Sequence, residues 1–312
     1  MQQKAEKFFI FCGQRSECLK NGSFFRPEVL WLSSQWKPQN FFNFKKGMGI
    51  KMRGASYFET EKGILIKYHG QEAETEIPEG VTGIGKSAFS DAKTLKKITL
   101  PGSVRKIGTG AFGMCENLEK VIFSEGVTEI EPTAFFKCKK LSEIALPNGL
   151  LKIGDSAFFG CAGLKKISVP ESVTLIGEYA FGGCFGLQDE NGFVIVRNVL
   201  FNYFGEKKII TVPQDVKKIG KEAFSWNYDL NIVQLNEGAT EIGDYAFLHC
   251  SALSEIYIPD GMTRIGMGAF LGCKNLKSIS LPKTVSVIGG GAFYDCPAEI
   301  VRKDKGEFLC AR

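Results

Sequence analysis

The sequence predicts a repeat solenoid in which short parallel β-strands stack coil upon coil. A motif, I-G-x-x-A-F, recurs nine times, with Glu131 in place of the glycine in one copy, and every step between copies is 23 residues except one of 43. Around it a longer pattern, L-x-x-I-x-L-P-x-x-V-x-x-I-G-x-x-A-F-x-x-C, keeps its apolar positions in register along most of the chain. A fixed period of about 20 to 50 residues is typical of stacked architectures, because each unit buries its apolar face against its neighbours.

The first element of each unit is a short strand. Leu95, Ile98 and Leu100 supply one apolar anchor and then alternate apolar residues, the period of a strand with one buried face. Proline follows the strand in most units, and because it has no N–H group it ends the pairing and turns the chain. These prolines are Pro101, Pro147, Pro170, Pro213, Pro259 and Pro282.

The second half of each unit holds another extended piece and a turn. Val104 and Ile107 face the core from the opposite wall, and we expect Gly108 to supply a turn with positive φ. The A-F-x-x-C-x-x-L run then predicts a short helical or 3₁₀ turn, with apolar residues at i, i+3 and i+6. Stacking should bring one phenylalanine from each unit into an aromatic spine. The spine residues are Phe89, Phe112, Phe135, Phe158, Phe181, Phe224, Phe247, Phe270 and Phe293.

The single 43-residue step predicts two arrays. Residues 58–89, shifted by 135, fall on 193–224 with matching Phe, Leu, Tyr, Gly and Pro positions. We therefore expect the same strand-and-turn module at the head of each array, with the first copy capping the open end of the solenoid. The predicted division is an N-terminal segment over 1–55, a cap and first array over 56–187, and a junction module, second array and C-terminal cap over 188–312.

Residues 1–55 depart from the repeat pattern. They hold 10 basic and 3 acidic residues of a chain whose formal net charge is +5, so residues 56–312 are close to neutral. The segment is rich in phenylalanine and matches no repeat. We expect it to be disordered or not native, with translation starting at Met48 or Met52. The alternative is a basic aromatic arm that binds a membrane or a partner.

Seven cysteines share one repeat position and predict a ladder of buried free thiols, which pack as small apolar side chains. Parallel stacked side chains suit the dihedral angle of a disulfide poorly. A zinc site needs ligands that converge on one point, and no histidine joins the ladder. The seven are Cys115, Cys138, Cys161, Cys184, Cys250, Cys273 and Cys296.

Composition and motifs argue against several classes of function. A near-neutral repeat body lacks the basic stripe of a nucleic-acid-binding protein. No run approaches the roughly 20 apolar residues of a membrane span and no signal peptide is visible, so on the residues alone we expect a cytoplasmic protein. No acid pair, nucleophile–base motif or phosphate loop falls outside the repeat frame. We therefore expect no catalytic, cofactor-binding or metal-binding residues.

The units resemble BspA-type leucine-rich repeats, the 23-residue class with L-x-x-I-x-I-P and V-x-x-I-G-x-x-A-F signatures, over about residues 58–298. The resemblance implies a right-handed solenoid of the leucine-rich-repeat type. It also implies a protein partner, of unknown identity, and a role in bacterial surface recognition or adhesion, with the chain at the cell surface or secreted.

On a leucine-rich-repeat strand the residues between the buried anchors face the concave surface, where we expect the partner to bind. Ile122, Ile232 and Tyr257 would form an apolar centre among polar neighbours; a solvated face without a partner is the alternative. Two other functions remain open: an intracellular scaffold or regulatory adaptor, and an enzyme with a site at the array junction. The candidate residues are Lys97, Thr99, Lys120, Ile122, Lys166, Ile232, Gln234, Glu255 and Tyr257.

Overall fold

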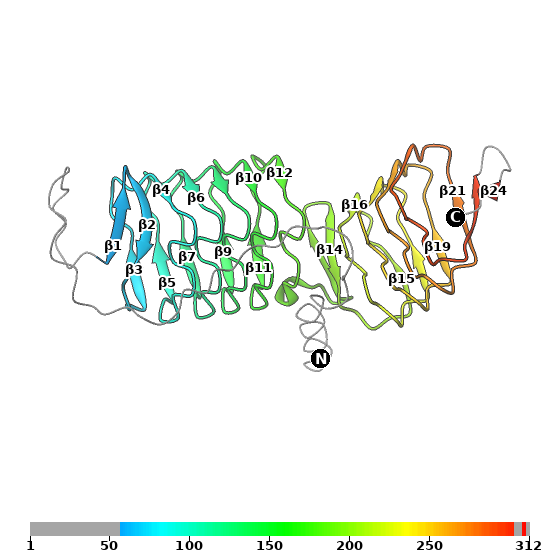
Figure 1. The fold of residues 1–312 in the computed structure, drawn as a ribbon, viewed down its shortest axis with the longest axis horizontal. Helices are drawn as coiled ribbons and strands as arrows, with labels where there is room; N and C mark the ends of the chain where they lie inside the picture. The colour runs from blue at the N-terminus through cyan, green and yellow to red at the C-terminus, as the bar shows by residue number, and fades with distance from the viewer. Residues whose placement is uncertain (1–56, 303–307, 310–312) are drawn as a thin grey trace, which may run out of the picture. The chain divides into compact units, whose positions relative to one another are not determined.

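The fold is seen in a computed structural model that describes residues 57–302 and the backbone of 308–309. The basic segment 1–55, with the alternative start sites Met48 and Met52, lies outside the described residues. Each coil contributes one strand to each of two parallel ladders, which run along opposite sides of the coils (Figure 1). The predicted solenoid of short stacked strands is therefore confirmed.

The V-strand ladder consists of the V-x-x-I strands, and in each array an antiparallel hairpin heads it. In the first array its strands are β1 (Phe58–Glu61), β2 (Ile64–Tyr68), β4 (Gly83–Ile84), β6 (Lys106–Ile107), β8 (Glu129–Ile130), β10 (Lys152–Ile153) and β12 (Leu175–Ile176). In the second they are β13 (Phe193–Val196), β14 (Val199–Tyr203), β16 (Lys218–Ile219), β18 (Glu241–Ile242), β20 (Arg264–Ile265) and β22 (Val287–Ile288).

The L-strand ladder consists of the strands of the L-x-x-I-x-L segments, which a proline follows in most coils. In the first array they are β3 (Glu74–Glu76), β5 (Lys97–Thr99), β7 (Lys120–Ile122), β9 (Glu143–Ala145) and β11 (Lys166–Ser168). In the second they are β15 (Ile209–Thr211), β17 (Ile232–Gln234) and β19 (Glu255–Tyr257), followed by a separate sheet of β21 (Ser278–Leu281), β23 (Glu299–Arg302) and β24 (Phe308–Leu309). After each proline the chain turns, as where the Val104 amide donates to the Pro101 carbonyl at 3.2 Å.

The A-F-x-x-C segment is not the helical turn that its spacing predicts. Within the described residues the 3₁₀ conformation occurs once, in η1 (Phe185–Leu187). Elsewhere two residues four positions apart have positive φ, as at Ser87 (54°) and Asp91 (60°). The amides of Ser87, Phe89 and Asp91 donate to the next coil at 2.7 to 3.0 Å, whereas those between them donate within their own coil. A helix would keep all of these bonds within one coil, so the segment is a run of turns that extends the inter-coil bonding.

Gly108 is needed for a reason other than the positive φ that we expected. Its φ is not positive, and the glycine with positive φ in this coil is Gly110, at 62°. A Cβ atom on Gly108 would lie 2.6 Å from the carbonyl oxygen of Ile84 and 2.9 Å from the carbonyl carbon of Gly85. The motif glycine therefore lets the backbones of adjoining coils approach closely.

The predicted aromatic spine is confirmed. In the first array successive rings from Phe89 to Phe181 stack with centroids 4.8 to 5.4 Å apart, and Tyr68 of the leading hairpin stacks on Phe89 at 4.8 Å. In the second array the rings from Phe224 to Phe293 stack at 4.9 to 5.3 Å. These rings and the aliphatic anchors of both ladders fill the interior of the coils.

The predicted ladder of free thiols is also confirmed, and all seven side chains are buried. Six of the thiols donate to the carbonyl oxygen of a spine phenylalanine 26 residues earlier, as Cys115 does to Phe89 at 3.0 Å. The thiol therefore satisfies a buried carbonyl as well as filling space. The repeat pattern alone does not indicate this second role.

These thiols should make stability depend on pH in the alkaline range. Burial raises the pKa of Cys115 and of Cys250 from 9.0 to about 12. Because the folded chain holds these protons more tightly, their contribution is complete below pH 9 and is lost as the pH rises toward 12. Denaturant titrations should show a free energy of unfolding that falls from about pH 9 to pH 11. The fall should be shallower with Cys115→Ala and Cys250→Ala, and identical slopes would contradict the assignment.

The two hairpins have the same register but different surroundings. Phe58 pairs with Tyr68 in the first and Phe193 with Tyr203 in the second, with the irregularity at the same step. One face of each hairpin covers the spine of its own array. The other face of the first hairpin carries exposed residues such as Glu59 and Glu61. The other face of the second hairpin is apolar and packs into the core of the first array.

The junction between the arrays is made by side chains, because β12 and the second hairpin do not pair. The rings of Phe181 and Phe201 meet edge to face at 5.3 Å, and those of Phe185 and Phe204 lie 4.3 Å apart. The buried Asn202 accepts a hydrogen bond from the Gly183 amide at 2.8 Å. The second hairpin thus joins two cores, one on each of its faces.

Candidate interaction surfaces

The predicted binding residues all lie on L-strands, where the middle residue of each strand faces the core. In the first array, register places the first residues of β5, β7, β9 and β11 side by side as a column, Lys97, Lys120, Glu143 and Lys166. The third residues form a parallel column, Thr99, Ile122, Ala145 and Ser168. Lys120 and Lys166 are exposed, whereas Lys97, Thr99 and Ile122 are half-buried.

In the second array, Ile232 lies beside Glu255 and Gln234 beside Tyr257. Tyr257 is 40% exposed, and its hydroxyl donates to Glu237 Oε1 at 3.0 Å. The L-strands of the two arrays belong to separate sheets. Ile122 therefore lies on a different sheet from Ile232 and Tyr257, the two residues that we expected to form an apolar centre with it.

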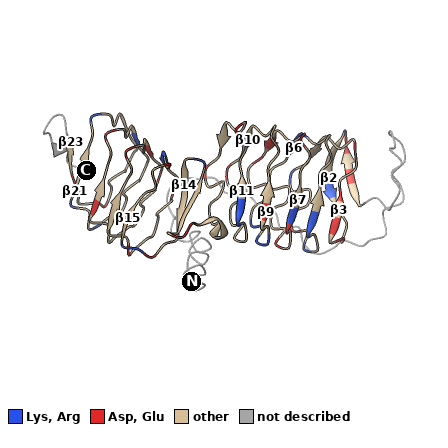
Figure 2. Cartoon of the chain, turned by 180° about the vertical axis from the view of Figure 1, so that it is seen from behind, with Lys and Arg blue, Asp and Glu red and all other residues tan. Residues whose placement is uncertain are grey.

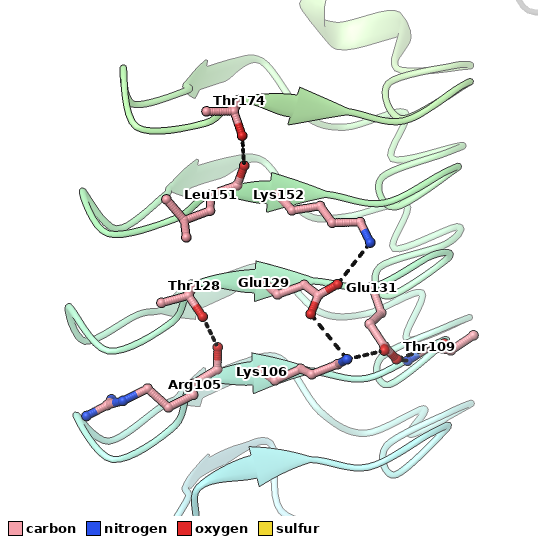
Figure 3. Close-up of polar contacts among 9 residues, drawn as sticks. All are labelled: Arg105, Lys106, Thr109, Thr128, Glu129, Glu131, Leu151, Lys152 and Thr174. Carbon is pink, nitrogen blue, oxygen red and sulfur yellow. Dashed lines mark hydrogen bonds and ion pairs between the residues drawn. The ribbon is translucent and has the colours of Figure 1, made fainter.

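The V-strand ladder carries a column of charges that the sequence analysis did not single out. In the first array Lys106, Glu129 and Lys152 lie on adjoining strands (Figure 3). Glu129 pairs with Lys106 at 3.2 Å and with Lys152 at 3.0 Å, and Lys106 also pairs with Glu131 at 2.6 Å. The hydrogen bond from Lys152, with Lys106 adding to it, holds the pKa of Glu129 below its usual value. The charges of this column are thus compensated within the fold.

The second array repeats this arrangement. Glu241 pairs with Lys218 at 3.0 Å and with Arg264 at 3.4 Å. In both columns, the residue before the isoleucine of V-x-x-I alternates between a basic and an acidic side chain from one coil to the next. This alternation at the 23-residue period is the sequence signal that would have revealed both columns. Adjacent opposite charges stabilise neighbouring strands, so their contribution to stability is enough to explain why these charged residues are present.

A small groove of about 90 Å³ lies at the array junction, close to where an enzyme site was one of the alternatives. Its charged residues are paired, as Lys221 is with Glu178 at 2.8 Å, and the Lys221 ammonium lies 5.3 Å from the centre of the Tyr179 ring. Burial lowers the pKa of Lys221, but the hydrogen bond and charge of Glu178 outweigh it and raise the pKa. Lys221 thus stays protonated near neutral pH.

Metal-ligand clusters and membrane-spanning helices are both absent from the described residues. No group of three or more His, Cys, Asp or Glu side chains there could hold a metal ion. In that same part of the chain, no helix has the length and apolar character needed to cross a membrane.

The chain is similar to crystal structures of bacterial leucine-rich-repeat proteins. One from Eubacterium ventriosum is 22% identical, the match covers 78% of each chain, and its TM-score of 0.52 supports the fold alone. A leucine rich cell surface protein from Faecalibacterium prausnitzii is 25% identical over 82% of this chain and 89% of its own, with a TM-score of 0.46. A leucine-rich repeat protein from Bacteroides ovatus is 25% identical over 84% and 71%, with a TM-score of 0.48.

The repeats themselves identify the family. No curated protein matches the chain. The family described as the BspA type leucine rich repeat region matches residues 68–188 and 195–304, which is most of the sequence. These ranges cover the repeats of both arrays and most of the hairpin β13–β14 that heads the second. The chain therefore belongs to the BspA-type leucine-rich-repeat family, whose solenoid fold is typical of proteins that interact with other proteins.

Proposed function

We propose that the chain is a non-catalytic protein-interaction module that serves recognition or adhesion at a bacterial surface. The outward face of the L-strand ladders supports this function, because its side chains repeat in register on strands that the core holds rigid. A preformed surface binds without the cost of ordering flexible segments. The proposed contact residues are Lys97, Thr99, Lys120, Ile122 and Lys166 in the first array and Ile232, Gln234, Glu255 and Tyr257 in the second.

The non-catalytic part of this proposal draws support from where the distinctive residues lie. The cysteines and phenylalanines of the repeat pack the core. The charged side chains of the V-strand columns and of the junction groove form ion pairs with one another. We further propose that 56–187 and 188–312 form two arrays, each with its own binding face.

Photo-crosslinking in the cells that make the protein tests the proposed face. A photoreactive residue at Lys120 or Gln234 should give protein adducts, because both positions are exposed on L-strands. The matched controls are Thr240 and Thr263, which are also exposed but lie just before the V-strands β18 and β20. Adducts from the controls alone, or from no position, would contradict the proposal.

Treatment of intact cells with an impermeant protease tests the location. Loss of this chain while a cytosolic protein survives would support surface recognition. Full protection would instead favour an intracellular scaffold or adaptor, and the crosslinked partners would then be cytosolic proteins.

A further inference from the structure

The two ladders of the first array differ in how many of their charged side chains form ion pairs. On the V-strand side each of Lys106, Glu129 and Lys152 has an ion-pair partner of opposite sign on an adjoining strand. On the L-strand side, strands β5, β7, β9 and β11 and the turns before them, residues 91–100, 114–123, 137–146 and 160–169, hold nine lysines against four acidic residues, whereas β3 at the end of this ladder carries Glu74 and Glu76. We call this surface the first strand face. In Figure 2 it shows blue on β7 and β11 and red on β9.

Most of these lysines are not neutralised by the fold. Lys97 pairs with Glu74 at 2.7 Å, but it also lies directly beside Lys120 in the register of β5 and β7. Like charges side by side on adjoining strands destabilise a sheet. Five exposed lysines form no ion pair with any residue that the structure describes: Lys96, Lys120, Lys140, Lys165 and Lys166. Lys120 and Lys166 lie beside Glu143 in the strand register, but neither forms an ion pair with it. Unlike the V-strand charges, these five lysines therefore have no ion-pair partner among the described residues.

The composition of the face indicates the kind of anion that it fits. The four segments contain no arginine, the residue best suited to paired hydrogen bonds with phosphate or sulfate. Their one aromatic residue, Phe123, is half-buried and packs on Phe135 at 6.4 Å, so no exposed ring can stack on a base. Beside the lysine column, which consists of Lys97, Lys120 and Lys166 with Glu143 between the last two, lies the uncharged column of Thr99, Ile122, Ala145 and Ser168.

We infer that the first strand face binds an extended acidic polypeptide segment whose carboxylates alternate with small apolar side chains. The carboxylates meet the lysine column, and the small side chains lie on the uncharged column next to it. This inference rests on the proposed function and names the chemical class of partner for one of its two faces. The second array lacks the feature, because its equivalent segments, 226–235, 249–258 and 272–281, hold two lysines and two acidic residues.

A fluorescent peptide of alternating Glu and Ala provides the probe, and its anisotropy with the full chain measures the dissociation constant. Binding should weaken as ionic strength rises to about 0.15 M, because exposed charges are screened. The double substitution Lys120→Glu with Lys166→Glu should weaken binding about tenfold at low salt. The matched control, Lys277→Glu with Lys283→Glu, makes the same charge change on exposed residues of the second array and should stay within about twofold.

Both variants keep the basic segment 1–55, so its contribution to peptide binding cancels in the comparison. Lys120→Gln with Lys166→Gln should show an intermediate loss, and equal melting temperatures would confirm that folding is intact. Equal affinities of the charge-reversed variant and the control would overturn the inference. So would tighter binding of heparin or duplex DNA than of the peptide at the same face. Either result would leave the proposed interaction function standing if crosslinked partners are found.

Discussion

Replacing Phe158 with alanine is expected to lower the free energy of unfolding by about 3 to 5 kcal/mol. The ring lies in the middle of the first array's spine, between Phe135 at 5.1 Å and Phe181 at 5.4 Å, with both neighbours within 2° of parallel. Its side chain is 0% exposed. The substitution removes the burial of the ring and leaves a cavity, and the hydrogen-bonded coils on either side limit collapse.

Phe159 provides the matched control, because it is the same residue type one position later. Its ring is half-buried and stacks on Phe136 at 5.6 Å, outside the spine. Urea titrations of Phe158→Ala and Phe159→Ala should therefore give a clearly larger loss for the spine residue. Equal losses would mean that the spine contributes no more to stability than stacking at the surface does.

The repeat architecture was predictable because packing constrains it at many positions at once. Apolar anchors at the same place in nine units leave one arrangement that buries them all. The local backbone geometry was harder to predict from the sequence. The spacing of Ala, Phe and Cys fits a helical turn, but residues such as Ser87 and Asp91 adopt positive φ so that alternate amides reach the next coil. Gly108 is likewise required because the backbone of another coil lies close to it, and the sequence of a single unit does not show that contact.

The candidate site was predictable to the level of which residues face outward. Alternation along each strand places Lys120 and Gln234 on the surface, and the structure confirms that position. Whether a charge is compensated depends on its neighbours across strands, 23 residues away. This is why the paired column of Lys106 and Glu129 was missed and why the lysines without an ion pair, such as Lys120 and Lys166, could be recognised only in the fold. Binding at this face stays a prediction.

The second large effect concerns the hairpin that joins the arrays. Val194 and Val196 are 0% and 5% exposed and pack into the core of the first array. Their counterparts in the leading hairpin, which caps an open end, are the exposed Glu59 and Glu61. Substituting Val194→Glu and Val196→Glu would thus give the junction hairpin the outer face of a cap. Each carboxylate would enter an apolar cluster without a partner, at a cost on the order of several kcal/mol.

The variant should lose the packing between the arrays while each array keeps its own spine. We expect thermal unfolding in two separate transitions, and faster amide exchange in the coil that ends with Phe181, whose ring Phe201 would no longer cover. The control, Glu59→Val with Glu61→Val, changes exposed positions only and should shift the free energy of unfolding by less than about 0.5 kcal/mol. A single transition at the wild-type temperature would mean that the hairpin does not hold the arrays together, and the division at residue 188 would then be wrong. Two transitions would establish that division, because only cores that are independently stable can melt apart once the shared hairpin stops joining them.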